Sequence, residues 1–464
     1  MSEKKRDYQY LSATHSLCSI CGNVVPAKVI RRGTAIYLLK NCLNHGMHEE
    51  ILEDDADFYL RQKEYDIPGD ETIHQTETVQ GCPYDCGLCP DHEQHTCIAL
   101  LEITQSCDLC CPNCYANSGA GDFIPLERVN RILDAFLEAE SGRAEILQVS
   151  GGEPTLHPEV LDIIQLALDK GIRYVMLNTN GLRIAHDFDF AQSLSRFRER
   201  FEVYLQFDGF GNETSRVLRG KDILEDKMKA LENLIRVKVP VTLVTTVAMG
   251  VNDHELGEIL RFGLRTSMVR GINFQPFAFF GRVGDISPNR RITRTGVLRR
   301  LEEQTDGILK MGDFVPLPCD VDRVAITMLL RDHDTYIPLT RKADIRKYLT
   351  MMDNTLQFQL QDLLSNATNE IKCNPGKCDC LSFMRDFIPL SSLAAKGLIL
   401  KDREILSRDV FRITVTSFLD RYNFEMKAMK KECVHVLTPD LRRIPFSAYN
   451  LIHRRNTADA ISYR

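Results

Sequence analysis

The feature that most constrains this chain is a pair of cysteine clusters with identical spacing. The segments CPYDCGLC, residues 82–89, and CDLCCPNC, residues 107–114, both contain the pattern CxxxCxxC. The chain has 16 cysteines among 464 residues, and they occur in groups. In a reducing compartment, thiols this close in sequence suit metal ions or iron-sulfur clusters better than disulfides. We therefore expect a fold built around several metal centres.

The sequence around the second cluster predicts that it lies in an active site. The largely apolar run Ile98–Ile103 predicts a buried strand before the cysteines, and Leu126–Glu140 is apolar at helical spacing after them. On a β/α barrel, loops that leave the carboxyl ends of strands line the active site. Three thiolates can hold three irons of a [4Fe-4S] cluster and leave the fourth iron open to a small chelating ligand. Cys107, Cys111 and Cys114 are the predicted ligands of this reactive cluster.

Apolar runs alternate with amphipathic stretches between residues 98 and 285, which predicts a parallel sheet or barrel. The six predicted strands are Ile98–Ile103, Glu145–Ser150, Tyr174–Asn178, Val203–Phe207, Thr242–Val247 and Ile272–Phe277. Helical patterns such as Leu126–Glu140 and Ile223–Val237 lie between them and would form an outer layer. The predicted fold class is α/β, a partial (β/α)6 barrel of the TIM type.

The glycine-rich segment Gly151-Gly152-Glu153-Pro154 follows the second predicted strand. A CxxxCxxC loop after the first strand and GGEP after the second resembles the radical SAM superfamily. In that superfamily the open iron binds the amino and carboxylate groups of S-adenosylmethionine (SAM). One electron then cleaves SAM to methionine and a 5'-deoxyadenosyl radical, which abstracts a substrate hydrogen. The resemblance implies that Gly151, Gly152, Glu153 and Pro154 contact the methionyl part of SAM; without it, the segment is a simple glycine-rich turn.

Polar residues at later strand ends are weaker candidates for binding the cofactor. Asn178 and Asn180 lie in LNTNG, and Gln206 and Asp208 lie in LQFDG. At the carboxyl ends of barrel strands such side chains would hydrogen-bond ribose or adenine. Their alternative interpretation is as caps and turn formers.

The predicted cluster loop departs from the usual superfamily pattern. An aromatic residue usually precedes the third cysteine, whereas here Asn113 stands there and Tyr115 follows. Cys110 is an extra thiol beside Cys111, and we interpret it as a bystander because it has no partner at ligand spacing.

The upstream cluster contains four thiols within 16 residues, at Cys82, Cys86, Cys89 and Cys97. Four thiolates can ligate every iron of a second [4Fe-4S] cluster, which would then relay electrons. The alternative is a structural zinc ion, since cysteine spacing alone does not distinguish these metals.

Beyond residue 285 the strand and helix alternation is lost, and we predict a separate C-terminal unit with a helix at Leu356–Thr368. Its cysteines form a pool for a third cluster or a structural zinc ion: Cys319, Cys373, Cys378, Cys380 and Cys433. If only three of them bound a cluster, an open iron would be left for substrate.

The N-terminal segment has the paired spacing of a zinc ribbon or a rubredoxin-like iron site. The predicted ligands are Cys18, Cys21, Cys42 and His45. They flank the alternating segment Thr34–Leu39, which predicts a strand, and His48 competes with His45 as the imidazole ligand. Such a set accepts zinc or iron.

The length of the chain predicts several units rather than one core. We divide it into a metal knuckle at 1–75, an auxiliary cluster loop at 76–97, the radical SAM core at 98–285 and the C-terminal unit at 286–464. This order resembles one group in the superfamily, which includes the archaeal tetraether lipid synthase and proteins assigned to methylating the pterin of methanopterin. The closing segment CVHVLTPDLRRIPFSAYN is similar to the end of that group.

The resemblance implies two reactions. The main prediction is coupling of lipid chains, in which hydrogen abstraction from a methyl terminus is followed by carbon-carbon bond formation. The alternative is radical methylation of a hydroxymethyl-dihydropterin. Phe274, Phe277, Phe279 and Phe280 are placed either to line a lipid groove or to pack in the core.

Composition excludes some partners. A formal net charge of -6 gives no overall attraction to nucleic acid. The sequence has no secretion signal and no apolar run long enough to span a bilayer, so we predict a cytoplasmic protein that touches membranes only peripherally, for a lipid substrate. A reductant such as ferredoxin or flavodoxin is the expected partner. The alternative class is a non-catalytic zinc scaffold that binds partners through its cysteine loops.

Overall fold

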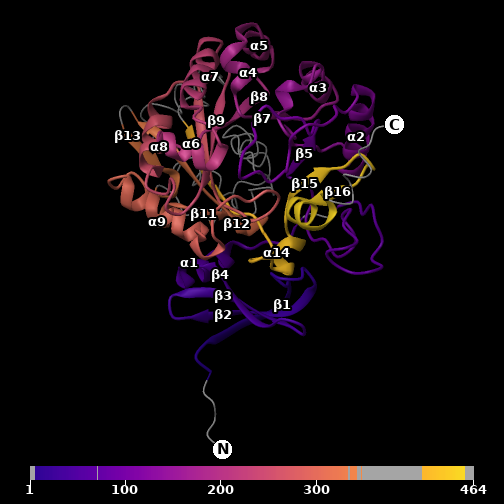
Figure 1. The fold of residues 1–464 in the computed structure, drawn as a ribbon, viewed down its shortest axis with the longest axis vertical. Coiled ribbons are helices and arrows are strands. Elements are labelled where there is room, and N and C mark those ends of the chain that lie inside the picture. The colour runs from indigo at the N-terminus through magenta and orange to yellow at the C-terminus, as the bar shows by residue number, and fades with distance from the viewer. Residues whose placement is uncertain (1–5, 70–71, 333–334, 342–345, 347–409, 455–464) are drawn as a thin grey trace, which may run out of the picture.

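The computed structural model describes residues 6–69, 72–332, 335–341, 346 and 410–454. A large α/β body carries a small antiparallel sheet at one end (Figure 1). The predicted helix Leu356–Thr368 and the predicted ligands Cys373, Cys378 and Cys380 lie outside the described residues.

Six parallel strands form the centre of the body. They are β5 (Ile98–Glu102), β6 (Ile146–Ser150), β7 (Tyr174–Thr179), β8 (Phe201–Gln206), β9 (Val241–Val247) and β10 (Val269–Pro276). They pair in chain order, each parallel to the next. All six predicted strands are therefore confirmed, as is the α/β class with its parallel sheet.

Helices connect these strands and pack on the outer side of the sheet (Figure 1). They are α2 (Leu126–Ala139), α3 (Val160–Asp169), α4 (Leu182–His186), α5 (Phe188–Leu194), α6 (Asn212–Arg219), α7 (Leu224–Arg236), α8 (Leu256–Arg265) and α9 (Arg294–Gln304). The apolar face predicted for α2 is buried, with Val129, Leu133 and Phe136 in the same core as strands β5 and β6. In the described part of the chain, no helix combines the length and apolarity needed to cross a bilayer.

Strands from the C-terminal part extend both edges of this sheet. They are β11 (Val315–Leu317), β12 (Asp320–Asp332), β13 (Thr335–Pro338), β14 (Val410–Thr416), β15 (Val434–Leu437) and β16 (Arg443–Pro445). Strand β14 pairs with β10, and β15 pairs with β5, both parallel. The edges of a six-stranded sheet leave backbone groups unpaired, and these strands satisfy them. Strands β11–β16 thus belong to the same sheet as the six central strands.

Two short helices, α14 (Met426–Lys430) and α15 (Phe446–Ala448), complete the described C-terminal part. Phe446 of α15 packs in a small core with Phe280 and Leu100. This core covers the inner face of the barrel beside β5.

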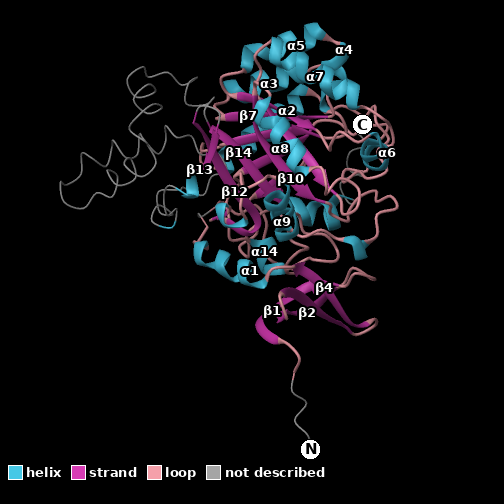
Figure 2. Cartoon of the chain, turned by 90° about the vertical axis from the view of Figure 1, so that its left-hand side faces the viewer, coloured by secondary structure: helices cyan, strands magenta, loops and turns pink. Residues whose placement is uncertain are grey.

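The small sheet is formed by β1 (Gln9–Leu17), β2 (Val24–Arg32), β3 (Ala35–Cys42) and β4 (Gly46–Glu53), antiparallel in chain order. Strand β3 contains the predicted strand Thr34–Leu39 apart from its first residue. Helix α1 (Ala56–Gln62) follows and lies between this sheet and the body in both views (Figures 1 and 2). Ile36, Leu38 and Ala56 form a core of their own.

A buried ion pair joins the small sheet to the body. Glu53, at the end of β4, accepts from Arg294 Nε at 3.2 Å and from the backbone N–H of Thr295 at 3.0 Å. Glu53 is 4% exposed and Arg294 1% exposed. Such a pair fixes the relative orientation of its two elements, because removing one charge leaves the other buried without a partner.

We expect Arg294→Ala to lower the free energy of unfolding by about 3–5 kcal/mol, since it leaves the Glu53 carboxylate buried without its cation. Arg261→Ala is the matched control, because Arg261 pairs at 2.6 Å with Asp306, whose side chain is 86% exposed. Denaturant unfolding followed by circular dichroism measures both. Equal midpoints for the two variants would show that the ion pair does not hold the sheet in place.

Candidate metal and cofactor site

A cavity of about 250 Å³ lies inside the barrel and extends to the loops that follow β5, β6 and β7. Cys107, Cys111 and Cys114 all line it, and so do Gly151 and Gly152. The structure therefore brings the predicted cluster ligands and the glycine-rich segment to one place, at the carboxyl ends of the strands where barrel enzymes hold their cofactors.

Backbone hydrogen bonds shape the cysteine loop. Cys114 and Arg282 exchange a pair of backbone bonds at 2.8 and 2.9 Å, and Arg282 Nε also donates to the carbonyl oxygen of Cys111 at 2.8 Å. Burial raises the pKa of the Cys107 thiol to about 12. A thiol with that pKa stays protonated at neutral pH unless a metal supplies positive charge, because metals bind the thiolate. A bound cluster would supply that charge, whereas the free Cys107 thiol is a poor nucleophile at neutral pH.

The departures from the superfamily pattern have structural explanations. Asn113 donates from Nδ2 to the carbonyl oxygen of Val217 at 3.1 Å and accepts from the backbone of Gly284 at 2.9 Å, so it clips the loop to its neighbours. Tyr115 lines the cavity, as Asn113 does, and its hydroxyl lies 3.0 Å from Ser150 Oγ. Cys110 is exposed, whereas the neighbouring Cys111 is buried.

The two glycines lie against the cysteine loop with no room for a side chain. Gly152 donates its N–H to the carbonyl oxygen of Thr104 at 2.8 Å. A Cβ on Gly151, which has φ of +134°, would lie 2.3 Å from that same oxygen, and one on Gly152 would lie 2.2 Å from the carbonyl oxygen of Ser106. Only glycine permits this approach.

The carboxylate of Glu153 holds this loop in place through hydrogen bonds. Its carboxylate accepts from the backbone of Thr155 at 3.1 Å, from Thr179 Oγ1 at 2.7 Å and from the backbone of Asn180 at 2.7 Å. Burial nevertheless raises its pKa, as expected for a side chain that is 1% exposed. Pro154 begins the short 3-10 helix Pro154–Leu156. Gly151, Gly152 and Glu153 all line the cavity, whereas Pro154 is not among its lining residues.

The two asparagines of LNTNG have different surroundings. Asn178 lines the cavity and donates from Nδ2 to Ser150 Oγ at 3.2 Å. Asn180 also reaches the cavity, but its Nδ2 donates to Asp108 at 2.6 Å and its Oδ1 accepts from the backbone of Leu182 at 2.9 Å. Asn180 thus forms a turn and ties it to the cysteine loop.

Arg219 is a site residue that the sequence analysis missed. It ends α6, lines the cavity and hydrogen-bonds Cys111, which lowers the pKa of that thiol against the stronger raising effect of burial. Asp208 holds it through two bonds of 2.7 Å, and Gln206, with its amide oxygen toward Arg219, accepts at 2.7 and 2.9 Å. Asp208 therefore orients Arg219 rather than lining the cavity. No sequence signal marks Arg219, because an arginine at a helix carboxyl end is also what the helix dipole favours.

The cysteines outside this cavity are grouped differently from the prediction. Cys97 Sγ lies 3.8 Å from that of Cys319, which lies 3.9 Å from that of Cys433. All three are buried and form a candidate metal site. The predicted set of Cys97 with Cys82, Cys86 and Cys89 is thus split, because Cys97 lies at the start of β5 and pairs through its backbone with Cys433 before β15.

Cys82, Cys86 and Cys89 remain together in the loop before β5. Burial, with the neighbouring thiols Cys82 and Cys89, raises the pKa of Cys86 well above its usual value. The carboxylate of Asp85 shapes the loop, since it accepts three backbone N–H bonds of 2.7 Å from residues 79–81. A second cluster on this loop stays a prediction, since the fourth predicted ligand, Cys97, lies with Cys319 and Cys433.

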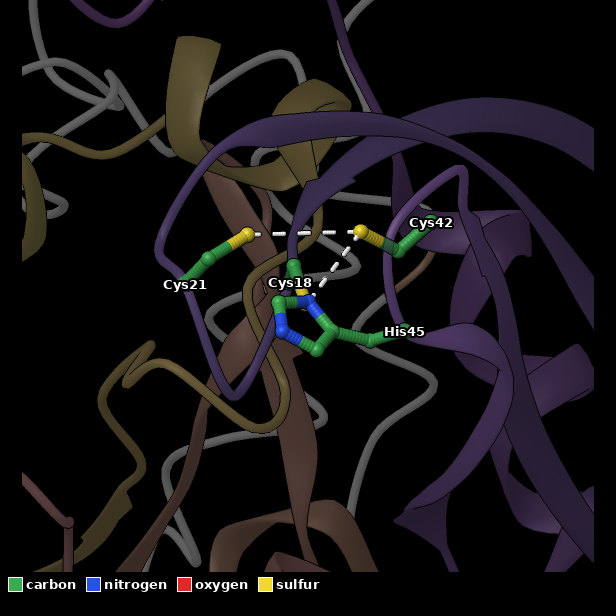
Figure 3. A group of neighbouring side chains, drawn as sticks. All are labelled: Cys18, Cys21, Cys42 and His45. Atoms are coloured by element: carbon green, nitrogen blue, oxygen red, sulfur yellow. Dashed lines mark hydrogen bonds between the residues drawn. The ribbon is translucent and has the colours of Figure 1, made fainter.

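The four predicted N-terminal ligands point toward one another from the β1–β2 turn, the end of β3 and the β3–β4 turn of the small sheet (Figure 3). Their ligand atoms all lie within 4.8 Å of one another. His45 Nδ1 is 3.6 Å from Cys18 Sγ and 3.5 Å from Cys42 Sγ, and the Sγ atoms of Cys21 and Cys42 are 4.0 Å apart. Two sulfur ligands of one tetrahedral zinc ion, each at 2.3 Å, lie about 3.8 Å apart. This set fits a single ion.

The four phenylalanines near the end of β10 divide between core and cavity. Phe274 is fully buried in the main core, whereas Phe277 and Phe280 line the cavity. Phe279 packs edge-on against Phe277 and Tyr422, with ring centroids 5.0 and 5.5 Å apart. They therefore do not form one continuous groove.

Comparisons with known proteins match two regions of the chain. The model of the radical SAM superfamily matches residues 101–263, and that of the HMPTM N-terminal zinc ribbon domain matches residues 10–54. The chain is 32% identical over 490 residues to the 7,8-dihydro-6-hydroxymethylpterin dimethyltransferase of Methanocaldococcus jannaschii. That similarity covers 97% of this chain and 95% of the relative.

Other similarities are confined to part of the chain. The mycofactocin maturase MftC of Mycolicibacterium smegmatis is 26% identical over 164 residues, 35% of this chain and 41% of that protein. The crystal structure of Streptococcus suis SuiB bound to S-adenosylmethionine aligns with a TM-score of 0.40 and 16% identity, covering 46% of this chain and 48% of that one.

We expect His45→Ala to remove about one metal equivalent per chain, because a structural zinc-type site needs all four ligands. Elemental analysis of the anaerobically purified full-length protein measures it. His48→Ala is the control, since His48 competes for this role in sequence but lies outside the ligand group. Loss of metal from His48→Ala but not from His45→Ala would show that His48, and not His45, is the imidazole ligand.

We expect Gly151→Ala to destabilise the cysteine loop, and to reduce bound iron and sulfide, because the new methyl group collides with the Thr104 carbonyl. Gly171→Ala is the matched control: Gly171 also has positive φ, +92°, but a Cβ there meets nothing within 4 Å. Gly171→Ala should lower the free energy of unfolding by about 1 kcal/mol and leave the iron content unchanged. Gly151→Ala should lower the free energy of unfolding further. Equal iron content in both variants would contradict the packing argument.

Proposed function

We propose that this chain, which belongs to the radical SAM superfamily, methylates a carbon atom of a reduced hydroxymethylpterin. The observation that carries the proposal is similarity over nearly the full length of both chains to an enzyme named as a hydroxymethylpterin dimethyltransferase. The matching zinc ribbon supports the same group. These findings favour the pterin alternative of the sequence analysis over its main prediction, the coupling of lipid chains.

The chain is a radical SAM enzyme, so its cofactors include a [4Fe-4S] cluster and SAM, and its further cysteine groups indicate additional metal sites. We assign Cys107, Cys111 and Cys114 to the SAM-binding cluster. When bound, the cluster and SAM supply a carbon radical that removes a hydrogen atom from the substrate. In the proposed reaction the substrate radical then forms a carbon–methyl bond while the bond between the methyl group and its separate donor breaks, and one electron from the reductant reduces the donor radical that is left. Each methylation raises the mass of the substrate by one CH₂.

The lining of the cavity supports a heterocyclic substrate. Gln148, Tyr204, Asn273 and Arg412 contribute polar side chains to its wall. Asn273 Oδ1 has no hydrogen-bond partner among the described residues, and an alkyl chain in contact with it would leave it unpaired, which is costly in a buried site. A pterin carries several ring nitrogens, an amino group and a carbonyl oxygen, and can pair with them.

Aromatic side chains in the wall of the cavity would keep water away from the radical. Phe277, Phe280 and Phe446 line the cavity together with Tyr115, whose ring packs 5.5 Å from that of Phe446. Exclusion of water protects a reactive intermediate from side reactions. Electrons would come from ferredoxin or flavodoxin, with the Cys82, Cys86 and Cys89 loop as the proposed relay.

The test is an anaerobic assay with the full-length reconstituted protein, SAM, dithionite and 6-hydroxymethyl-7,8-dihydropterin deuterated on its carbon-bound positions. We expect deuterium in 5'-deoxyadenosine, and Cys107→Ala should reduce it to background, because that variant loses a cluster ligand. Cys110→Ala, which removes the exposed neighbouring thiol, should retain activity.

Two outcomes would contradict the proposal. Deuterium transfer from labelled acyl chains, with none from the pterin, would favour lipid coupling. A colourless protein that contains zinc without iron or sulfide, and cleaves no SAM, would favour the non-catalytic scaffold.

A further inference from the structure

Two polar side chains meet inside the barrel, on strands rather than on the cluster loops. Asn273 of β10 donates from Nδ2 to the hydroxyl oxygen of Tyr204 of β8 at 2.6 Å, and both residues line the cavity. They reach each other across β9, where Tyr204 is paired with Thr242 and Asn273 with Val244. Inward-facing side chains of alternate barrel strands meet in this way.

The other end of the Asn273 amide is unsatisfied. Asn273 is 5% exposed, and its Oδ1 accepts no hydrogen bond from any residue that the structure describes. A buried carbonyl without a partner costs about 1–3 kcal/mol, and such groups are rare in native structures. A ligand that donates an N–H to this oxygen would explain why the residue is tolerated here.

Tyr204 supplies the complementary group. Its oxygen accepts the bond from Asn273, which leaves its own O–H to donate. Burial raises the pKa of Tyr204 to about 12, so the hydroxyl keeps its proton at neutral pH. Asn273 and Tyr204 thus present an acceptor and a donor side by side.

The charged residues near this pair already have hydrogen-bond partners. Arg412 Nη2 donates to Glu202 Oε1 at 3.1 Å and to Thr242 Oγ1 at 3.3 Å. Glu202 is buried, and its carboxylate is held in this pair. A neutral ligand edge therefore fits better here than an ionic one.

We propose that Asn273 and Tyr204 form the subsite that recognises a lactam edge of the substrate, an N–H beside a C=O. This inference rests on the proposed function, since a pterin carries that edge at N3–H and C4=O. The N3–H would donate to Asn273 Oδ1, and C4=O would accept from the Tyr204 hydroxyl.

This binding mode also orients the substrate. The carbon-bound hydrogens of 6-hydroxymethyl-7,8-dihydropterin all belong to the pyrazine half and its side chain, opposite the lactam edge. With the lactam edge held on the strands, that half would point toward the loop that carries Cys107, Cys111 and Cys114, beyond the carboxyl end of β5. The pair would act as specificity and positioning residues, without touching the reacting atoms.

The experiment measures the dissociation constants of 6-hydroxymethyl-7,8-dihydropterin and its N3-methyl analogue on the full-length reconstituted protein with SAM. We expect the N3-methyl group to weaken binding to the unaltered protein about tenfold to a hundredfold, since it removes the donor to Asn273. Asn273→Ala should weaken binding of the parent pterin by a similar factor. It should then no longer distinguish the two ligands.

Asn233→Ala is the matched control for a lost buried asparagine, because Asn233 donates to the carbonyl oxygens of Ile184 and Ala185, away from the cavity. It should bind both ligands like the unaltered protein. The comparison of the two ligands on the unaltered protein needs no variant, so a folding defect in Asn273→Ala does not decide the result.

The outcomes separate this inference from the function on which it rests. Equal affinity of the unaltered protein for both ligands, with deuterium transfer from the pterin intact, would overturn the subsite and leave the proposed function standing. Absence of both pterin binding and deuterium transfer would overturn the proposed function, and the subsite with it.

Discussion

The active end of this barrel depends on the contact between two loops, one after β5 and one after β6. The backbone N–H groups of Gly152 and Glu153 donate to the carbonyl oxygens of Thr104 and Ser106, each at 2.8 Å. The approach is so close that neither glycine has space for a Cβ. Since the cysteine loop starts at this contact, the directions of Cys107, Cys111 and Cys114 follow from it. Glu153 then links the same loop to the end of β7 through Thr179 and Asn180.

Buried charge around this contact suits a metal cluster. Arg219, held by Asp208, hydrogen-bonds Cys111, and Lys227 donates to the carbonyl oxygen of Asn180. Burial lowers the pKa of Lys227 to about 8, so its charge is costly to maintain in this position. Three thiolates would bring three negative charges into this loop, and nearby cations would offset part of that charge. Asp208 already pairs with Arg219, whereas Lys227 donates to a carbonyl oxygen, so Lys227 is the cation that an anionic group in the loop would stabilise.

The sequence predicts local patterns well and distant pairings poorly. Each of the six parallel strands is a short apolar run, so a few neighbouring residues suffice to predict it. The spacing of Cys107, Cys111 and Cys114 likewise involves only eight consecutive residues. In contrast, Cys97 joins Cys319 and Cys433, which lie more than 200 residues away along the chain. The pairing of β15 with β5 brings Cys433 to Cys97, and Cys319 reaches them from the turn between β11 and β12. Arg219 and Asn273 were also missed, because an arginine that ends a helix and an asparagine within a strand look ordinary without their neighbours.

The same limitation explains why the sequence favoured a lipid. The segment Ile272–Phe280 is rich in phenylalanine, and read along the chain it suggests one apolar surface. In the barrel, alternation along β10 sends Phe274 into the outer core and Asn273 into the cavity, while Phe277 and Phe280 lie beyond the strand at the upper wall. The wall of the cavity consequently combines aromatic side chains beyond β10 with polar side chains such as Asn273 and Tyr204 on the strands. A flat heterocycle with a hydrogen-bonding edge can contact both kinds of side chain. An alkyl chain offers no hydrogen-bond partner to the polar ones.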